Sequence, residues 1–145
     1  MSEKNLPAGT YTLKNAATNS VLDLWNGESA EGKVIQGYES HGGDNQKWQL
    51  QWTGTGNSVT IRNVASGTYI GKGSSGFAQS SPVLGSITAV PLLLVAADKG
   101  FAMEVAELRN TVVGLEQNSS SNTVPAVYRS NTGIDTQKWH FVKQD

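Results

Sequence analysis

Short runs in which apolar and polar residues alternate recur from one end of the chain to the other. The clearest of them are Thr10–Lys14, Lys47–Trp52, Val59–Arg62 and Lys138–Val142. Alternation is typical of strands with one buried face, because successive side chains of a strand point to opposite sides. Helical periodicity is almost absent, and breaks rich in Gly, Asn and Ser separate the runs. This pattern predicts an all-β domain built as a barrel or sandwich.

The longest apolar stretch, Pro82–Ala97, is interrupted by Ser86, Thr88 and Pro91. A helix needs about 20 continuous apolar residues to cross a bilayer, so we expect this stretch to lie in a protein core. We therefore expect no insertion into a membrane. The length of 145 residues suits one domain, which we expect to span residues 1–145.

Charge and cysteine content exclude several classes of partner. The formal net charge is −1 and the charged residues are scattered singly, so no basic stripe can follow a phosphate backbone. We expect no nucleic-acid partner. The absence of cysteine excludes disulfides and thiolate metal sites. The first residues, MSEKNLPAGTYTL, contain no apolar run of signal-peptide length, which favours a cytoplasmic protein.

A repeat organises the chain. Tyr11–Leu24 matches Val59–Lys72 without a gap, and Phe101–Glu116 is a third, weaker copy. The matched apolar positions are Leu13 with Ile61, and Leu22 with Ile70 and Val113. The first and last copies also end alike, in Gln-Lys-Trp at 46–48 and 137–139, whereas the middle copy has Val-Pro-Leu at 90–92.

The spacing within the repeat is constant and favours one architecture. Asp23 precedes Gln46 by 23 residues, and Gly114 precedes Gln137 by the same number. Three copies of about 47 residues, at approximately 6–52, 53–98 and 99–145, fill the chain with roughly four strands each. A propeller needs about four to eight blades, so three copies would not close one. A three-lobed barrel is expected instead, because closure removes exposed sheet edges.

These residues resemble a known family. Three repeats with Gln-x-Trp at their ends resemble the ricin B-type β-trefoil lectins, and PAGTYTLKNAATNSVLDL followed by HGGDNQKW is similar to the small single-domain ricin B-like lectins of fungi. The resemblance implies a β-trefoil of twelve short strands, in which a hairpin triplet caps a six-stranded barrel. It also implies binding of galactose or N-acetylgalactosamine on glycans, and a role in fungal defence. We expect no cofactor.

The family pattern implies a binding site in the first repeat. An Asp after the second strand accepts from two sugar hydroxyls, an aromatic follows some fifteen residues later, and an Asn stands beside the Gln of the motif. The matching residues are Asp23, Tyr38, His41 and Asn45, with Tyr38 15 and Asn45 22 residues after Asp23. A carboxylate or amide can bridge neighbouring hydroxyls and a ring can cover the C–H face of a sugar.

Structural interpretations stand beside each of these assignments. Asp23 could cap backbone amides of a turn, and Asn45 could likewise be structural. Tyr38 could only pack against the barrel, and His41 could be solvated. Gly42, which we include in the site, could let a ligand approach the backbone or could simply serve a turn. Trp25 could be a second platform for the sugar or an exposed dimer contact.

Gln46, Trp48, Gln137 and Trp139 are predicted to be structural. A Trp side chain buries a large area and its indole N–H needs a partner. A Gln side chain can satisfy buried backbone groups, here between lobes. These residues are expected to hold the site in place without contacting the sugar.

The other two repeats depart from the site pattern. The second has Gly71 at the position of Asp23, and the third has Gly114 there and Thr136 in place of Asn45. One site per chain is therefore expected. A single shallow site would be weak, so we expect avidity from a homodimer. Replacing Asp23 with Ala is expected to abolish binding and to leave thermal stability nearly unchanged.

Other kinds of site find little support. Gly71–Gly76 fits GxGxxG, but FAQSSPVLG follows it and shows no helical pattern, so a dinucleotide site is not expected. His41 and His140 are the only histidines and no metal-ligand spacing occurs, so no metal site is expected. No motif of an enzyme is present, and we expect a protein without catalytic activity. One alternative is a β-trefoil protease inhibitor that acts through a surface loop, with Gly73–Ser81 as the candidate. A second alternative is a structural or scaffolding trefoil without a ligand, because the second and third repeats lack the site pattern.

Overall fold

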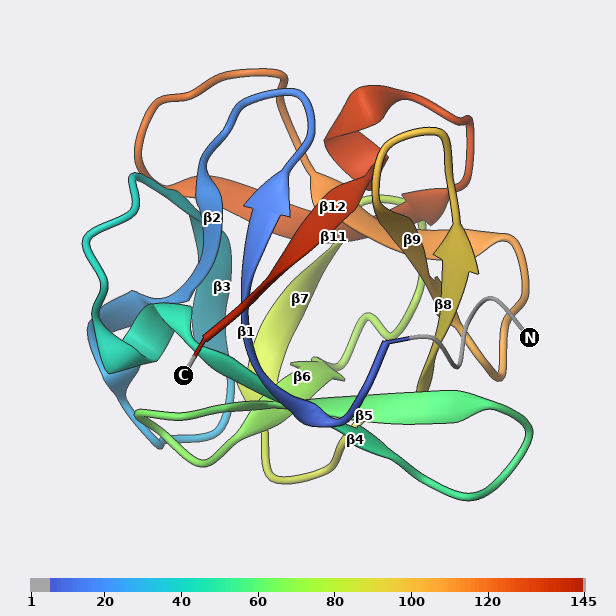
Figure 1. The fold of residues 1–145 in the computed structure, drawn as a ribbon, viewed down its shortest axis with the longest axis horizontal. Helices are drawn as coiled ribbons and strands as arrows, with labels where there is room; N and C mark the ends of the chain where they lie inside the picture. The colour runs from blue at the N-terminus through green and yellow to red at the C-terminus, as the bar shows by residue number, and fades with distance from the viewer. Residues whose placement is uncertain (1–5, 145) are drawn as a thin grey trace.

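A computed structural model describes residues 6–144, and this part of the chain consists of strands joined by turns and short loops (Figure 1). The twelve strands found between residues 6 and 144 are β1 (Gly9–Asn15), β2 (Val21–Leu24), β3 (Lys33–Tyr38), β4 (Trp48–Trp52), β5 (Ser58–Asn63), β6 (Tyr69–Lys72), β7 (Ser81–Ser86), β8 (Leu92–Ala96), β9 (Phe101–Val105), β10 (Thr111–Leu115), β11 (Val124–Ser130) and β12 (Trp139–Lys143). Three single 3₁₀ turns accompany them among the described residues, namely η2 (Trp25–Gly27), η3 (Asp44–Gln46) and η4 (Asp135–Gln137). The prediction of an all-β protein is confirmed.

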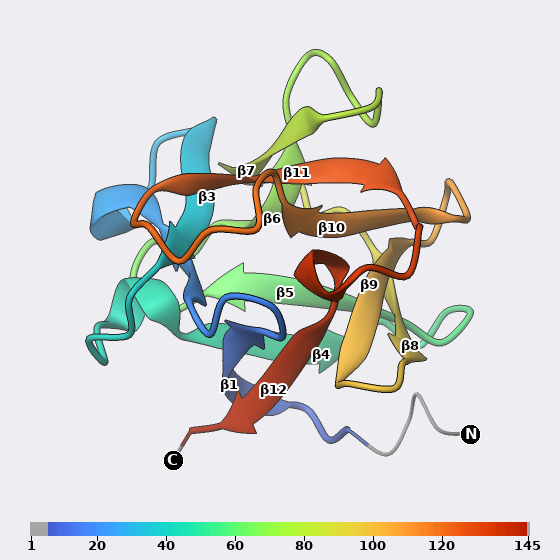
Figure 2. The same ribbon diagram turned by 90° about the horizontal axis from the view of Figure 1, so that it is seen from above.

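Six of the strands form a closed ring. In order around the ring they are β1, β4, β5, β8, β9 and β12, and β12 pairs with β1 again. All six pairings are antiparallel. In Figure 2 β1 and β12 lie toward the lower left and β8 and β9 toward the right, and β5 runs across the view to meet β8. Because the ring closes, these strands leave no unpaired sheet edge.

The other six strands form a cap of three hairpins. The hairpins are β2–β3, β6–β7 and β10–β11, and they pair with one another through β3–β7, β7–β11 and β11–β3. A barrel of six strands capped by a hairpin triplet is the arrangement that the β-trefoil resemblance implies. The cap orients the side chains of β2 and β3, which carry the first part of the predicted site.

The repeat positions of the sequence meet in one core. Leu22, Ile70 and Val113 are each fully buried. Leu13 is also fully buried, and 1% of its counterpart Ile61 is exposed. Apolar residues at matched positions of three copies therefore face the same interior, which is why the copies tolerate sequence drift elsewhere but keep size and apolarity here. The strands predicted from alternation coincide with β1, β4, β5 and β12 to within two residues at each end.

The apolar stretch Pro82–Ala97 supplies β7 and β8 and contributes four fully or nearly fully buried side chains to this core: Val83, Val90, Leu92 and Leu94. No helix among residues 6–144 combines the length and the apolarity that crossing a bilayer would require.

Candidate functional site

The first repeat carries a buried carboxylate. Asp23 lies in β2 opposite Gln36 of β3, and only 2% of it is exposed. An ionised carboxylate is costly to bury unless hydrogen-bond donors surround it. Its environment therefore has to supply those donors.

Three side-chain amides meet this requirement. Gln36 Nε2 donates to Asp23 Oδ1 at 3.1 Å. Asn45 Nδ2 and Gln46 Nε2 both donate to Oδ2, at 3.2 and 2.9 Å. Hydrogen bonds to a charged acceptor are about twice as strong as neutral ones. The carboxylate consequently ties the β2–β3 hairpin to the η3 turn.

These bonds argue against the expectation that replacing Asp23 with Ala leaves stability unchanged. Removing the carboxylate would take one acceptor from each of the three amides, although Asn45 and Gln46 would keep their bonds to the carbonyls of Leu24 and Glu39. Each orphaned buried donor costs about 1–3 kcal/mol. Asp23 therefore has a structural part in addition to any contact with a ligand.

Two rings stand over the carboxylate. Tyr38 and His41 meet edge to face, with ring centroids 5.8 Å apart and an interplanar angle of 76°. His41 Nε2 lies 3.8 Å from Asp23 Oδ2. His41 Nδ1 accepts from the backbone N–H of Gly43 at 3.1 Å, so a neutral His41 ring carries its proton on Nε2, the atom that faces Asp23.

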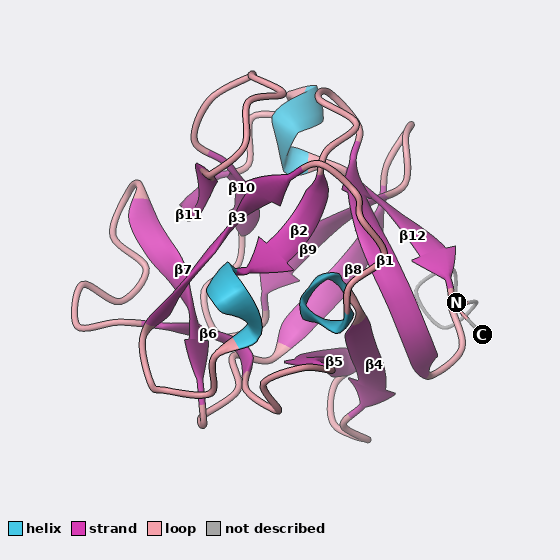
Figure 3. Ribbon diagram, turned by 90° about the vertical axis from the view of Figure 1, so that its left-hand side faces the viewer, coloured by secondary structure: helices cyan, strands magenta, loops and turns pink. Residues whose placement is uncertain are grey.

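Together these groups surround a cavity of about 190 Å³. Its lining residues are Asp23, Trp25, Asn26, Gln36, Tyr38, His41 and Asn45. Figure 3 looks at this end of the molecule, and the turns η2 and η3 lie side by side in its foreground. Pockets for drug-sized ligands have about 300–1,000 Å³, so this cavity suits a ligand no larger than a single sugar ring.

The η3 turn is held by backbone and side-chain contacts on both flanks. A Cβ atom at Gly43 would lie 2.6 Å from His41 Cε1 and 2.8 Å from Asn45 Oδ1, so a larger residue would displace these two side chains of the site. Asn63, from the second repeat, donates through Nδ2 to the carbonyl of Asn45 at 3.0 Å. Gly42, by contrast, does not line the cavity, and its φ of +76° is that of a turn residue. Within this loop, Gly43 is the glycine that the packing of the site requires.

The residues of the Gln-x-Trp motifs make matching contacts in both lobes. Trp48 Nε1 donates to the carbonyl of Leu22, and Trp139 Nε1 to that of Val113, both at 3.0 Å. Both indoles are fully buried. Trp48 thereby joins the start of β4 to β2, and Trp139 joins the start of β12 to β10.

The two Gln side chains also satisfy backbone groups, but within one lobe. Gln46 Nε2 donates to the carbonyl of Glu39, and its Oε1 accepts from the N–H of His41. Gln137 does the same with Ser130 and Thr132. The expectation that these Gln residues act between lobes was wrong. The turns that carry the two motifs are bonded from a neighbouring lobe by Asn63, described above, and by Asn15, whose Nδ2 donates to the carbonyl of Thr136.

Sequence reasoning missed two polar residues of the cavity, Gln36 and Asn26. Gln36 had a detectable signal, because it is a buried polar residue where the second and third repeats have Leu84 and Val127. Asn26 had none, since it is an ordinary turn residue with a positive φ of 58°. Trp25, left open between two roles, lines the rim of the cavity and is 46% exposed.

The corresponding place in the second repeat is closed. A Cβ atom at Gly71 would lie 2.4 Å from Ser86 Cβ, so no side chain fits at the position of Asp23. The nearby cavity of about 310 Å³ contains Glu31, which belongs to the first repeat. Ser86 Oγ and the N–H of Ile87 donate to the Glu31 carboxylate and hold its pKa below its ordinary value.

The third repeat is filled from a different side. A Cβ atom at Gly114 would lie 3.0 Å from Gln137 Cγ. Arg129, at the position of Tyr38, donates through Nη1 to the carbonyl of Glu116 and through Nε to Ser80 Oγ. Thus neither lobe offers a carboxylate in the place that Asp23 has in the first.

The segment Gly73–Ser81, the alternative inhibitor loop, is folded into consecutive turns. Phe77 packs edge to face on Tyr128, with ring centroids 4.9 Å apart. Gln79 Oε1 accepts from the N–H of Ser130. These contacts fasten the segment to the third repeat, so nothing in its conformation favours the inhibitor alternative.

Comparison with known proteins identifies relatives of the chain. The family described as ricin-type beta-trefoil lectin domain-like matches residues 3–84. The agglutinin of Rhizoctonia solani is 58% identical, with a TM-score of 0.94 over 96% of this chain and 97% of that one. No curated protein matches the chain.

Two more distant structures share the fold. The ricin B-like lectin of Macrolepiota procera, solved in complex with lactose, is 23% identical, with a TM-score of 0.85 over 96% of this chain and 99% of that one. ThreeFoil, a designed protein of threefold symmetry, is 22% identical, with a TM-score of 0.87 over 94% and 99% of the two chains.

Proposed function

Because the chain belongs to the ricin-type β-trefoil lectin-like family, we propose that it is a non-enzymatic lectin for terminal galactose or N-acetylgalactosamine residues of glycans. The cavity of the first repeat is the proposed site. The observation that carries this proposal is the Asp23 carboxylate, oriented by three amides at a cavity with two aromatic side chains over it.

The remaining hydrogen-bonding capacity of the cavity fits a pair of neighbouring hydroxyls. Asp23 Oδ1 accepts from Gln36 alone among residues 6–144, so a lone pair remains for a hydroxyl. Asn45 Nδ2 donates both of its hydrogens, one to Asp23 Oδ2 and one to the carbonyl of Leu24. The Oδ1 atom of Asn45 therefore remains as an acceptor. His41 Nε2 and the second hydrogen of Gln36 Nε2 are the donors. Each sugar hydroxyl can then both donate and accept.

The apolar face of the sugar needs an aromatic partner. Tyr38 lines the cavity beside His41, so we assign to Tyr38 the contact with the sugar C–H groups. Trp25 at the rim covers the part of a glycan beyond the first ring. Lys33 Nζ lies 5.5 Å from the centre of the Trp25 ring and restrains it.

Calorimetric titration with lactose, N-acetylgalactosamine and glucose tests the proposal. We expect binding of the first two and much weaker binding of glucose. The variant Asn45→Thr introduces the residue of the third repeat, removes the amide and should weaken lactose binding by at least about tenfold, as loss of a polar contact to a charged cluster does. Thr136→Ser, in the third repeat, is the control and should bind normally. Absence of binding to both galactose-type sugars would refute the proposal.

A homodimer is the second part of the proposal. One small site of this kind binds weakly, and pairing of two chains multiplies the affinity for clustered glycans. Sedimentation equilibrium measures this directly, and a monomer at the concentration at which the protein binds cells would contradict it.

A further inference from the structure

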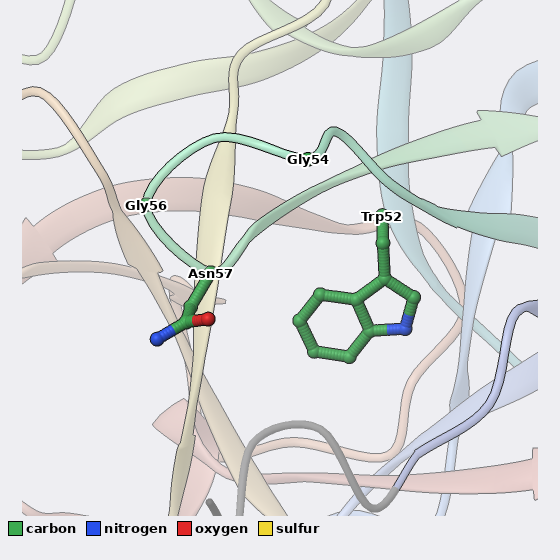
Figure 4. Close-up of a pocket in the computed structure, with 4 residues that line it drawn as sticks. All are labelled: Trp52, Gly54, Gly56 and Asn57. Atoms are coloured by element: carbon green, nitrogen blue, oxygen red, sulfur yellow. The ribbon is translucent and has the colours of Figure 1, made fainter.

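A second cavity, of about 400 Å³, lies beside the turn that joins β4 to β5 (Figure 4). Its lining residues are Trp52, Gly54, Gly56 and Asn57. In Figures 1 and 2 this turn lies at the right of the molecule, whereas η2 and η3 of the first site lie at the left. The two cavities are therefore at opposite ends of the long axis. No residue is common to the two linings.

Trp52 packs against the edge of the core and leaves part of its ring exposed. It lies on the same face of β4 as the buried Trp48 and Leu50, one step beyond them, and is partly exposed. The register of the barrel puts Ala96 and Lys143 at the same place in the other two repeats. A small residue and a charged one thus occupy the equivalent positions, so the indole is particular to the first repeat.

The indole is also fixed in orientation. Trp52 Nε1 donates to the carbonyl of Leu6 at 3.0 Å. This bond satisfies the polar edge of the ring and leaves its faces as apolar surface. A fixed aromatic face binds a ligand with little loss of side-chain entropy.

Polar groups without partners border the same cavity. The Asn57 side-chain amide makes no hydrogen bond to any residue from 6 to 144, and neither do the backbone N–H groups of Gly54 and Gly56. In Figure 4 the side chains of Asn57 and Trp52 extend from the same side of the turn. Asn57 has a φ of 62°, a left-handed turn conformation that Asn adopts more readily than most residues, and this conformation sets the direction in which its side chain leaves the backbone.

We propose that this cavity binds a second pyranose ring, which stacks its C–H face on Trp52 and donates and accepts hydrogen bonds at the Asn57 amide. The four lining residues carry no charge, which selects a neutral ligand. The volume lies within the range of about 300–1,000 Å³ typical of small-ligand sites. The choice of a sugar as ligand rests on the proposed function, whereas the ring, the amide and the cavity are independent of it.

Two sites at opposite ends change what one chain can do. A single chain would bridge two glycans, and it would bind clustered glycans more tightly than either site alone. A dimer would then raise the number of sites from two to four.

Fluorine NMR of the whole chain labelled with 5-fluorotryptophan tests this inference. The four signals, assigned by single Trp→Phe variants, report on Trp25, Trp48, Trp52 and Trp139. Methyl β-D-galactopyranoside and methyl β-D-glucopyranoside are titrated separately. We expect the Trp52 signal to shift to a plateau with at least one of them, while the buried Trp48 and Trp139 signals stay.

The outcomes separate the two proposals. A Trp25 signal that saturates while that of Trp52 stays unmoved by both sugars would overturn the second site and keep the first. If no signal moves and no heat of binding is detected, both proposals fail.

A variant of the second site sharpens the test. Asn57→Gly removes the amide, and glycine accepts the same backbone conformation. It should raise the sugar concentration at the midpoint of the Trp52 titration by about two- to twelvefold, the equivalent of one net hydrogen bond. The midpoint of the Trp25 titration should stay unchanged. Gln51→Ala, an exposed neighbour on the opposite face of β4, is the matched control and should change neither. An unaltered Trp52 midpoint in Asn57→Gly would contradict the proposed role of the amide.

Discussion

The first and third lobes have the same framework but differ at the positions that line the cavity of the first lobe. We call these positions the mouth of the lobe. With a constant offset of 91 residues, Gln46 and Trp48 correspond to Gln137 and Trp139 and make the same contacts. The positions of the mouth, by contrast, all differ. Asp23, Gln36, Tyr38, His41 and Asn45 correspond to Gly114, Val127, Arg129, Thr132 and Thr136.

This difference separates the residues that build a lobe from those that give it a site. The Trp contacts and the Gln contacts to backbone groups bind each lobe to its own hairpin and recur in both lobes, while Gln46 additionally bonds Asp23 in the first lobe. In the first lobe the mouth is a polar cavity where a carboxylate gathers amides, whereas in the third lobe the Arg129 side chain bonds to Glu116 and Ser80. Four predictions test this separation.

The largest effect is expected from the framework. Trp48→Ala and Trp139→Ala should each lower the free energy of unfolding by about 3–5 kcal/mol, because each empties a fully buried indole site. Chemical denaturation measures both. If one variant were as stable as the unchanged protein, the two lobes would not share the framework described above.

Asp23→Ala should affect both stability and binding. It should lower the free energy of unfolding by about 1–3 kcal/mol, the cost of one orphaned buried donor, because water in the adjoining cavity can accept from the N–H groups that line it, and it should abolish lactose binding. Thermal unfolding and calorimetry on the same sample measure the two effects. Unchanged stability would mean that water replaces the carboxylate and that the three amides are not truly buried.

His41→Ala isolates binding from folding. The His41 side chain is 44% exposed, so its removal should change stability by less than about 0.5 kcal/mol. Loss of the Nε2 donor should weaken lactose binding by about two- to twelvefold. Thr132→Ala, its counterpart in the third lobe, serves as the control and should leave lactose affinity as it is. Equal effects of the two variants would place the sugar elsewhere.

The smallest effect concerns the ion pairs of the two turns. In η4, Asp135 is bonded by Lys99 and Lys138, which hold its pKa below the ordinary value, whereas in η3 Asp44 faces Lys47 alone. A carboxyl with a lowered pKa in the folded state adds stability at neutral pH, and this is lost as the pH falls through that pKa. Below about pH 4, therefore, the unchanged protein should lose slightly more stability than Asp135→Asn does.

Denaturation series from pH 7 downwards measure this difference, with Asp44→Asn as the comparison. The exposed position of these groups keeps the effect small. A steeper acid loss in Asp135→Asn than in the unchanged protein would reverse the assigned sign.

The strands, the core and the main site residues could be predicted from the sequence because they depend on periodic patterns. Leu13, Leu22 and their counterparts recur with the repeat, and Asp23 and Asn45 stand at spacings that the family resemblance supplies. Gln36 could have been found by aligning it with Leu84 and Val127. Asn26 could not, since its place at the cavity depends on how η2 lies beside η3.

By itself, the sequence determined the all-β class and the closed three-lobed architecture, and it singled out the first repeat for the proposed site, because repeated apolar positions and motif spacing are properties of the linear chain. Only the tertiary structure decided that Asp23 is buried under three amides, that Gln46 and Gln137 act within their own lobes, and that Trp52 borders a second cavity. Each of these depends on which side chains meet across distant strands, and hydrogen-bond partners and open space exist only once those strands are packed.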